Sequence, residues 1–463
     1  MIGAPMEPHP LREEIEEAFE APAEALQESI EFVKKEERAI ISKRPFKLAE
    51  EYWDTLGPGL TTGAADDDPS GIATYSQAGA QYGLQLIWTA LFTYPFMAVV
   101  QEMCARIGIV SGQGLAANIR RHYPAYALYG VTALLFFANA LNIAADLGAM
   151  AAGTRLILPQ FGAELLVIVF ALISLLLQIF TTYARYAKYL KYLALALLSY
   201  VAVALSIGLD WGDVLRHTLV PSMTFSKDQI FLVAAVLGTA ISPYLFFWQT
   251  SQEVEEQILK GETTIESRKG QANEQSLRRM RIDVWSGMLF SNLITFFIFA
   301  ACAGTLYAHG ITNIVTADQA ALALRPFGEF AFFLFALGIV GTGLLAVPVL
   351  AGSSAYALAE SFEWKHGLHY KLKQAYAFYG VIIVSMLLGI AANFAHLDPI
   401  KGLIYAAVAN GVIAPFILFF VVRLSSNAQH MGAHANRPFT AFLGWVTVGF
   451  MALSGIAALA TLL

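Results

Sequence analysis

"TTGAADDDPSGIATYSQAGAQYG" occupies residues 61–83 and lies inside the first long apolar region of the chain. Its centre holds three consecutive carboxylates, Asp66, Asp67 and Asp68, and the residues at 69–71 are Pro, Ser and Gly. An ionised carboxylate in the middle of a membrane costs about 2.5–3.5 kcal/mol on insertion scales, while proline and glycine interrupt a helix. Backbone groups freed by such a break persist at membrane depth only where they line a cavity or a ligand. The stretch therefore predicts a broken transmembrane helix that carries a functional site.

The composition of the chain is that of a membrane protein. Of its 463 residues, 57% are hydrophobic and 14% are charged, whereas about a quarter of the residues in a soluble domain are charged. We therefore expect an all-α integral membrane protein that has the lipid bilayer as a partner. Cys104 and Cys302 lie in apolar stretches and are expected to be buried. The sequence has no G-x-x-x-x-G-K-[ST] run, so we expect no nucleotide to drive the protein. We also expect no nucleic-acid partner and no resident cofactor.

Eleven apolar spans follow a polar N-terminal tail at 1–50, in which no apolar segment of a secretory signal occurs. Each span is close to the roughly 20 residues that a helix needs to cross a bilayer. They are placed at 55–82, 85–109, 124–152, 162–183, 187–208, 228–252, 284–307, 329–359, 376–394, 400–422 and 439–462.

The positions of Lys and Arg predict the orientation of these spans. If the N-terminus is cytoplasmic, most of the 29 Lys and Arg residues fall on the inner side. The exceptions are Arg155, Arg216, Lys227, Arg325 and Lys401. Because basic residues concentrate in cytoplasmic loops, we expect a multi-pass protein of the plasma (inner) membrane with a cytoplasmic N-terminus and a C-terminus outside.

Two spans are interrupted at matching positions. The first is broken by "DDDPSG" at 66–71, and the sixth is broken within "GTAISPYLFF" at 238–247. Five spans separate the two breaks, so the two halves would insert with opposite topology, and paired broken helices of this kind mark the binding site of a transporter. The predicted organisation is a cytoplasmic tail at 1–50, inverted five-helix repeats at 51–208 and 209–424, and an eleventh helix at 425–463.

The sixth span supplies oxygen groups that would face the aspartates. Its centre carries the hydroxyls of Thr239, Ser242 and Tyr244, together with carbonyls freed around Pro243. Carboxylate, hydroxyl and carbonyl oxygens suit hard divalent cations, so we expect a cation site. The alternative for Ser242 is a hydroxyl that bonds back to its own helix.

The third span adds "NALNIAAD", in which Asn139, Asn142 and Asp146 share one helix face. Asn410 in the tenth span is a similar polar group. These residues either line the cavity or make the polar contacts between helices that are common in membrane bundles. The polar side chains at 249–253 likewise either line an exit path or form a polar helix end.

These motifs resemble those of the Nramp family of divalent-metal transporters. "GPG" is followed by eight residues and "DPSG", where the family has "DPGN", and "QAGAQYG" resembles its "QAGAQFG". Three further stretches resemble its second, third and sixth helices: "QEMCARIGIVSGQGLAANIRRHYP", "AADLG" and "GTAISPYLFF". The resemblance implies a LeuT-type fold, with alternating access around a site between broken helices one and six. It also implies that Asp68 is the metal-binding aspartate.

Four positions depart from the family pattern. Gly71 replaces an asparagine ligand, Ser242 a methionine ligand, Tyr244 a histidine and Asn139 a glutamate of the third helix. Loss of the soft methionine ligand favours harder ions, and the altered site resembles that of the Nramp-related magnesium transporters. The expected metal-site residues are Asp68, Asp67, Gly71, Thr239 and Ser242, and those expected around them are Asp66, Ser70, Asn139, Asn142, Asp146, Tyr244 and Asn410.

The function implied by this resemblance is import of a divalent metal ion without proton coupling. Mg²⁺ is the expected substrate, with Mn²⁺ as a second one. One alternative is a proton-coupled Mn²⁺/Fe²⁺ importer of the ordinary Nramp type. A second is a sodium-coupled amino-acid symporter of LeuT-type fold, although the aspartates would repel a substrate carboxylate. A third is a membrane sensor that signals through its N-terminal tail.

Overall fold

A computed structural model of the protein describes residue 52 and residues 56–181, 197–314, 317–328, 330–394 and 399–462. The predicted tail at 1–50 and residues 187–196 of the fifth predicted span lie outside these ranges. The described residues form helices and connecting segments, with no strand among them. Cys104 and Cys302 are both buried and free, as the sequence predicts.

The helices follow one another along the chain with few long connections. Those of the first half are α3 (Pro58–Asp66), α4 (Pro69–Tyr82), α5 (Trp88–Ser111), α6 (Leu115–His122), α7 (Ala125–Arg155), α8 (Ala163–Phe180), α10 (Leu198–Ser206) and α11 (Trp211–Leu219). Those of the second half are α12 (Lys227–Ala240), α13 (Pro243–Leu259), α14 (Ile265–Gly270), α15 (Glu274–Thr305), α16 (Ala317–Ala321), α17 (Phe330–Ser361), α18 (Tyr376–Phe394), α19 (Pro399–Ser425), α20 (Ala428–Met431) and α21 (Pro438–Leu462).

Length and hydropathy identify the membrane-spanning helices. In the described residues, eight helices are long and apolar enough to cross a membrane. Pro69–Leu86 and Trp88–Ser111 pass the same test together and meet at a bend of 105°. The first predicted span corresponds to α3 and α4, and the second corresponds to α5. The predicted all-α membrane fold is therefore confirmed, with breaks in spans one and six.

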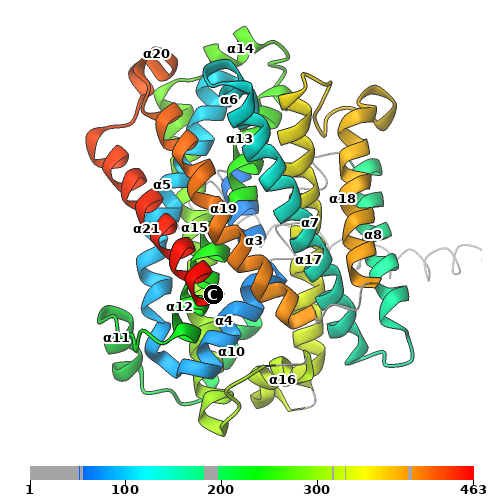
Figure 1. The fold of residues 1–463 in the computed structure, drawn as a ribbon, viewed down its shortest axis with the longest axis vertical. Coiled ribbons are helices and arrows are strands. Elements are labelled where there is room, and N and C mark those ends of the chain that lie inside the picture. The colour runs from blue at the N-terminus through cyan, green and yellow to red at the C-terminus, as the bar shows by residue number, and fades with distance from the viewer. Residues whose placement is uncertain are drawn as a thin grey trace, which may run out of the picture. The chain divides into compact units, whose positions relative to one another are not determined.

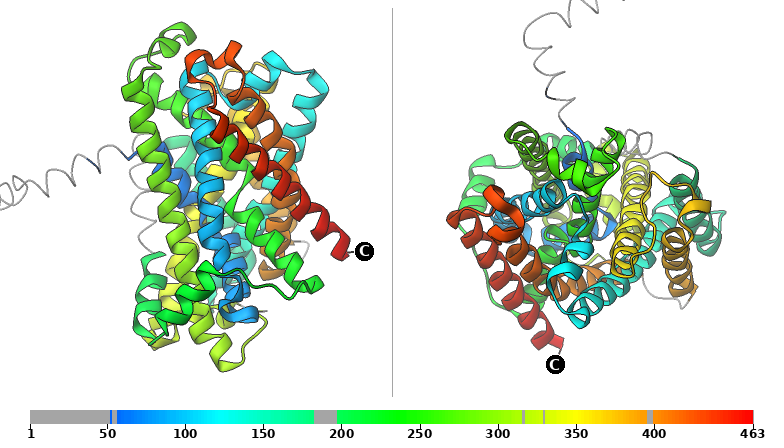
Figure 2. Two further views of the ribbon diagram at one scale, coloured as in Figure 1. Left: turned by 90° about the vertical axis from the view of Figure 1, so that its left-hand side faces the viewer. Right: turned by 90° about the horizontal axis from the view of Figure 1, so that it is seen from above.

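The connecting helices gather at the two ends of the bundle. Figure 1 shows α6, α14 and α20 at one end, and α11 and α16 at the other. Helices that cross a membrane in alternating directions produce this distribution. In both views of Figure 2, α21 lies on the outside of the bundle. Which end faces the cytoplasm remains a prediction from the basic residues.

The break in the first span arises from its local sequence. Pro69 begins α4, where its missing N–H is not needed and its fixed φ suits a helix start. Asp68 caps this helix, because its side chain accepts a hydrogen bond from the Gly71 N–H at 2.7 Å. Asp67 ends α3 in a non-helical conformation (φ −83°, ψ 53°). The chain thus leaves two half-helices whose ends meet at the aspartates.

The break in the sixth span also lies directly before a proline that begins the second half-helix. Here α12 ends at Ala240 and Pro243 begins α13, so Ile241 and Ser242 connect the two half-helices. Ser242 has extended backbone angles (φ −79°, ψ 126°) and occupies the N-cap position without a side-chain capping bond. Both breaks are buried within the bundle.

A carboxylate on α15 holds the start of α3. The side chain of Asp283 accepts hydrogen bonds from the backbone N–H groups of Gly57, Gly59 and Leu60 at 2.7, 2.6 and 3.0 Å. The first N–H groups of a helix have no partner inside the helix, and a negative charge there also complements the helix dipole. Asp283 thereby fixes the first half-helix against α15.

Glycines allow α3 and α15 to approach each other closely. A Cβ atom placed on Gly59 would overlap the backbone of α15 at Val284, and one on Gly63 would overlap the carbonyl of Gly287. A Cβ atom on Gly287 would in turn overlap the carbonyl of Gly59. Small residues permit such close helix packing in membranes. The position of α3 therefore depends on the absence of side chains at this contact.

Candidate metal site between the broken helices

Asp68 lies at the point where the two broken helices meet. Its Oδ1 accepts hydrogen bonds from the Ser70 hydroxyl at 2.6 Å and from the Gly71 N–H at 2.7 Å. The Tyr244 hydroxyl of α13 lies 3.4 Å from its Oδ2 and donates to the Ala65 carbonyl at 2.9 Å. A side chain from the sixth span therefore contacts both the carboxylate and the open end of α3.

The other two aspartates point toward α15. Asp66 accepts a hydrogen bond from the Ser291 hydroxyl at 2.8 Å, and Asp67 accepts one from the Thr295 hydroxyl at 3.4 Å. One oxygen of each carboxylate, Oδ1 of Asp66 and Oδ2 of Asp67, has no hydrogen-bond partner. The three consecutive carboxylates are thus directed to two different neighbours, and only Asp68 faces the sixth span.

Asp146 on α7 adds a further carboxylate near Asp68. The two are close enough to interact electrostatically, and neither side-chain oxygen of Asp146 has a hydrogen-bond partner. Asp146, Asp66, Asp67 and Asp68 are all at most 2% exposed. Unpaired buried charge is costly, so these carboxylates need a cation or a proton to be stable here.

The hydroxyls of Thr239 and Ser242 donate to carbonyls within the sixth span itself. Ser242 donates to the Thr239 carbonyl at 2.6 Å and lies 3.1 Å from that of Gly238. Thr239 donates to the Val236 carbonyl at 2.9 Å. This is the arrangement that the sequence left open as an alternative for Ser242. Each hydroxyl oxygen keeps its acceptor capacity, so it can still face a cation while its proton is donated to the helix.

The asparagines join helices to one another. Asn142 and Asn410 are paired through their side-chain amides at 3.0 and 3.4 Å, linking α7 to α19. The Asn139 amide donates to the Leu350 carbonyl at 3.0 Å and to the hydroxyls of Ser353 and Ser354, each at 2.9 Å, on α17. These bonds fit the packing alternative, although Oδ1 of Asn139 remains without a partner.

The described residues contain no group of three or more His, Cys, Asp or Glu side chains arranged to hold a metal ion. The site is therefore centred on one carboxylate, Asp68, with hydroxyl and backbone groups around it. Its partners are Ser70 and Gly71 on α4 and Tyr244 on α13. Such a site offers a cation few direct charged ligands and many oxygen dipoles.

The polar side chains at 249–253 continue from this site along α13. Gln249 donates to Glu253 at 2.9 Å, and both side chains are buried. The side-chain oxygen and nitrogen of Gln252 have no hydrogen-bond partner, and the residue is fully buried. In this structure the stretch is therefore enclosed, so it does not form an open path.

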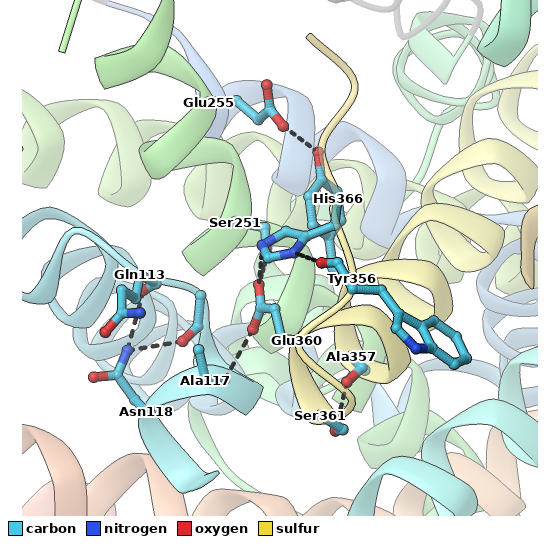
Figure 3. Close-up of polar contacts among 12 residues, drawn as sticks. Gln113, Ala117, Asn118, Ser251, Glu255, Tyr356, Ala357, Glu360, Ser361 and His366 are labelled. Atoms are coloured by element: carbon cyan, nitrogen blue, oxygen red, sulfur yellow. Dashed lines mark hydrogen bonds and ion pairs between the residues drawn. The ribbon is translucent and has the colours of Figure 1, made fainter. Parts of the chain in front are cut away.

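A cluster of buried carboxylates and their partners joins the C-terminal half of α13 to α17 and α6 (Figure 3), and the sequence did not predict it. Glu360 of α17 accepts from the Ala117 N–H of α6 at 3.0 Å, lies 3.4 Å from the Ser251 hydroxyl of α13 and is 3.9 Å from His366. Glu255 of α13 accepts from the Tyr356 hydroxyl of α17 at 2.7 Å. The cluster thus ties α13 to α17 and α6. The sequence feature that could have predicted this cluster is the presence of a carboxylate in each of two apolar helices, Glu255 in α13 and Glu360 in α17.

Ser291 and Thr295 were also missed. They lie four residues apart on one face of α15, toward Asp66 and Asp67. Hydroxyl residues are common in apolar helices, so nothing in the seventh span singles these two out. Their role becomes visible only when α15 is seen packed against the first broken helix.

Comparison with known proteins identifies the family of the chain. The family model described as "Natural resistance-associated macrophage protein-like" matches residues 59–461. The chain belongs to the Nramp family. Among relatives of this Nramp protein, the divalent metal cation transporter MntH of Klebsiella pneumoniae (strain 342) is 29% identical over 408 residues, covering 86% of this chain and 91% of the relative. MntH of Erwinia tasmaniensis is 29% identical over 325 residues, covering 68% and 72%.

Solved structures show the same fold. A manganese transporter from Eremococcus coleocola superposes on this Nramp protein with a TM-score of 0.71 at 17% identity, covering 89% of this chain and 88% of the other. Mhp1, a nucleobase-cation-symport-1 family transporter, superposes with a TM-score of 0.53 at 15% identity, covering 88% and 91%. The predicted LeuT-type fold is therefore confirmed.

Proposed function

We propose that this Nramp protein transports divalent metal ions by alternating access, and that it prefers Mg²⁺ while also accepting Mn²⁺. Family membership and the relatives named as divalent metal cation transporters support the class of substrate. The observation that carries the proposal is the position of Asp68, a buried carboxylate at the meeting point of both broken helices.

The type of ligand around Asp68 supports a preference for Mg²⁺. The groups closest to Asp68 are the Ser70 and Tyr244 hydroxyls and the Gly71 N–H. Where relatives in the family carry a methionine and a histidine in helix six, this chain has Ser242 and Tyr244. Oxygen ligands suit hard cations, and a thioether favours softer ones.

The sparse set of charged ligands supports transport of a partly hydrated ion. Mg²⁺ dehydrates reluctantly and is usually bound through one or two carboxylates while it keeps several waters. A site with one central carboxylate, and with hydroxyls in place of larger ligands, suits that behaviour. Asp67 would then attract the ion by its negative charge without binding it directly, because its side chain turns toward α15.

The membrane potential is sufficient to drive such uptake. Moving one elementary charge across 100 mV is worth about 2.3 kcal/mol, so a divalent ion gains roughly twice that. The helix-six histidine and the third-helix glutamate of proton-coupled relatives are Tyr244 and Asn139 here. We therefore propose that uptake is not coupled to protons. We also propose that the protein lies in the plasma membrane with its N-terminus in the cytoplasm.

A proton-coupled Mn²⁺ importer is the second candidate function. Asp146 favours it, because a buried carboxylate without a hydrogen-bond partner close to the site could carry a proton. The structural likeness to a manganese transporter concerns the fold alone. Ion selectivity and proton movement distinguish the two candidates.

Replacing Ser242 with Met tests the proposed selectivity. The substitution places a thioether at the helix-six break and removes space for a hydrated ion, so we expect Mg²⁺ uptake to fall at least about tenfold while Mn²⁺ uptake is retained. The measurement is the initial rate of uptake of each ion into proteoliposomes at a fixed membrane potential.

Ser206 provides the matched control. It is exposed on α10 and its hydroxyl also bonds to a carbonyl of its own helix, that of Ala202 at 2.5 Å. Ser206→Met should leave both uptake rates unchanged. Equal losses of Mg²⁺ and Mn²⁺ uptake in Ser242→Met would refute the role of this position in selectivity.

A further inference from the structure

A groove opens on the outer surface of the bundle between α7, α19 and α21. Its volume is about 580 Å³, within the range of sites that hold small ligands. The residues that line it include Phe416 and Phe419 of α19, Tyr126 and Leu134 of α7, and Ile456 of α21. Figure 1 shows α19 lying between α21 and α7.

The groove is apolar and uncovered within the described chain. Tyr126, Phe416 and Ile456 are 79%, 56% and 66% exposed. All three helices are membrane-spanning by length and hydropathy, so this surface faces the bilayer. An elongated hollow of apolar side chains at membrane depth suits the acyl chains of a lipid.

Two arginines lie at the end of the groove that carries α6 and α20. Arg423 is exposed and follows Phe416 and Phe419 on the same stripe of α19, at spacings of seven and four residues. Arg121 is exposed in the last turn of α6, five residues before Tyr126. In the part of the chain that the structure describes, neither arginine forms an ion pair.

Ring contacts fix this cationic end against the groove. The Tyr123 ring packs edge-on against Phe420, another groove residue, with centroids 4.8 Å apart. The rings of His122 and His430 lie against each other with centroids 3.4 Å apart. Partial burial, His122 and Arg121 lower the pKa of His430 below its usual range. A lowered pKa favours the neutral form of His430, so the positive charge at this end of the groove comes from the arginines Arg121 and Arg423.

We propose that this groove binds an anionic phospholipid, with its acyl chains on α19 between α7 and α21 and its phosphate at Arg121 and Arg423. Basic pockets between transmembrane helices recognise anionic headgroups in this way, and aromatic residues such as Tyr123 and Tyr126 are typical of the membrane interface. The apolar groove alone would accept any lipid. The two unpaired arginines supply the selection for negative charge.

The test compares phosphatidylglycerol with phosphatidylcholine carrying the same acyl chains. The full-length protein in detergent is titrated with each lipid, and its melting temperature is followed, because a ligand that binds only the folded state stabilises it. We expect phosphatidylglycerol to reach half of its effect at a concentration about tenfold lower. The double variant Arg121→Gln/Arg423→Gln should respond equally to both lipids.

A second pair of variants tests the groove itself. A Cβ atom on Gly130, which lines the groove, meets no atom within 4 Å, so Gly130→Leu would fill the groove without a clash inside the protein. It should weaken the response to both lipids. Gly380→Leu on α18, where the space around a Cβ atom is equally open, should change neither.

Three results would overturn the proposal. The first is an equal response of the unaltered protein to both lipids. The second is a preference for phosphatidylglycerol that survives the loss of both arginines. The third is a dimer that Gly130→Leu separates, measured by light scattering after size-exclusion chromatography, which would make a second copy of the chain the occupant.

Discussion

Asp68→Asn is expected to reduce uptake of divalent ions by at least about 100-fold, which corresponds to about 2.8 kcal/mol of lost interaction with the ion. The substitution removes the only carboxylate that contacts both the first half-helix break and the sixth span in the described structure. Asparagine is as good a helix cap as aspartate. Its Oδ1 can still accept from Ser70 and Gly71, so α4 should begin at the same residue.

Asp68→Asn is informative because it removes the negative charge of residue 68 and keeps the hydrogen bonds that cap α4. Its melting temperature without metal should stay close to that of the unaltered protein, while metal uptake into proteoliposomes is lost. Asp228→Asn is the matched control, since this exposed carboxylate lies in the first turn of α12 away from the break. Full uptake by Asp68→Asn would remove Asp68 from the proposed site.

Gly287→Val is expected to displace the first half-helix and to abolish transport. A Cβ atom at this position would overlap the Gly59 carbonyl, and overpacking of this kind costs about 1–3 kcal/mol or more. The helix α3 has nine residues, too few to be stable alone. A shift would also separate the N–H groups of α3 from Asp283, which removes their cap.

The expected result for Gly287→Val is a melting temperature several degrees lower, together with loss of uptake. Gly380→Val on α18 carries the same change in helix propensity without the clash, because nothing lies within 4 Å of its Cβ position. It should retain both properties. Identical melting temperatures for the two variants would mean that the contact between α3 and α15 does not fix the half-helix.

The main features of the fold could be predicted because they are local properties of the sequence. Apolar spans follow from hydropathy, and the two breaks follow from Pro69 and Pro243, which begin α4 and α13. The family resemblance added the LeuT-type connection between the two broken helices, which periodicity alone does not give.

The arrangement of the site could be predicted less well because it depends on contacts between distant helices. Three consecutive aspartates looked like one cluster, yet Asp66 and Asp67 turn toward α15 while Asp68 faces α13. Successive residues at a helix break point in different directions. Which neighbour each one meets is decided by the packing of α15, and the sequence around Ser291 carries no mark of it.

The asparagines illustrate the same limit. Asn142 and Asn410 were both recognised as polar groups in apolar spans, but their pairing across α7 and α19 needed the tertiary structure. Asn139 shares the helix face of Asn142 in the sequence pattern and instead reaches α17. A polar residue in a membrane helix predicts a polar partner, and it does not reveal which helix supplies that partner.

The most direct test of the account is to follow Mg²⁺ entry and internal pH together in proteoliposomes that hold the unaltered protein at a fixed inside-negative potential. The account predicts that Mg²⁺ enters, that Mn²⁺ competes with it, and that the internal pH does not change as the metal enters. Uptake of Mn²⁺ without Mg²⁺, accompanied by acidification of the interior, would contradict it. That result would show that Ser242 and Tyr244 do not set selectivity or coupling, and the chain would act as a proton-coupled manganese importer.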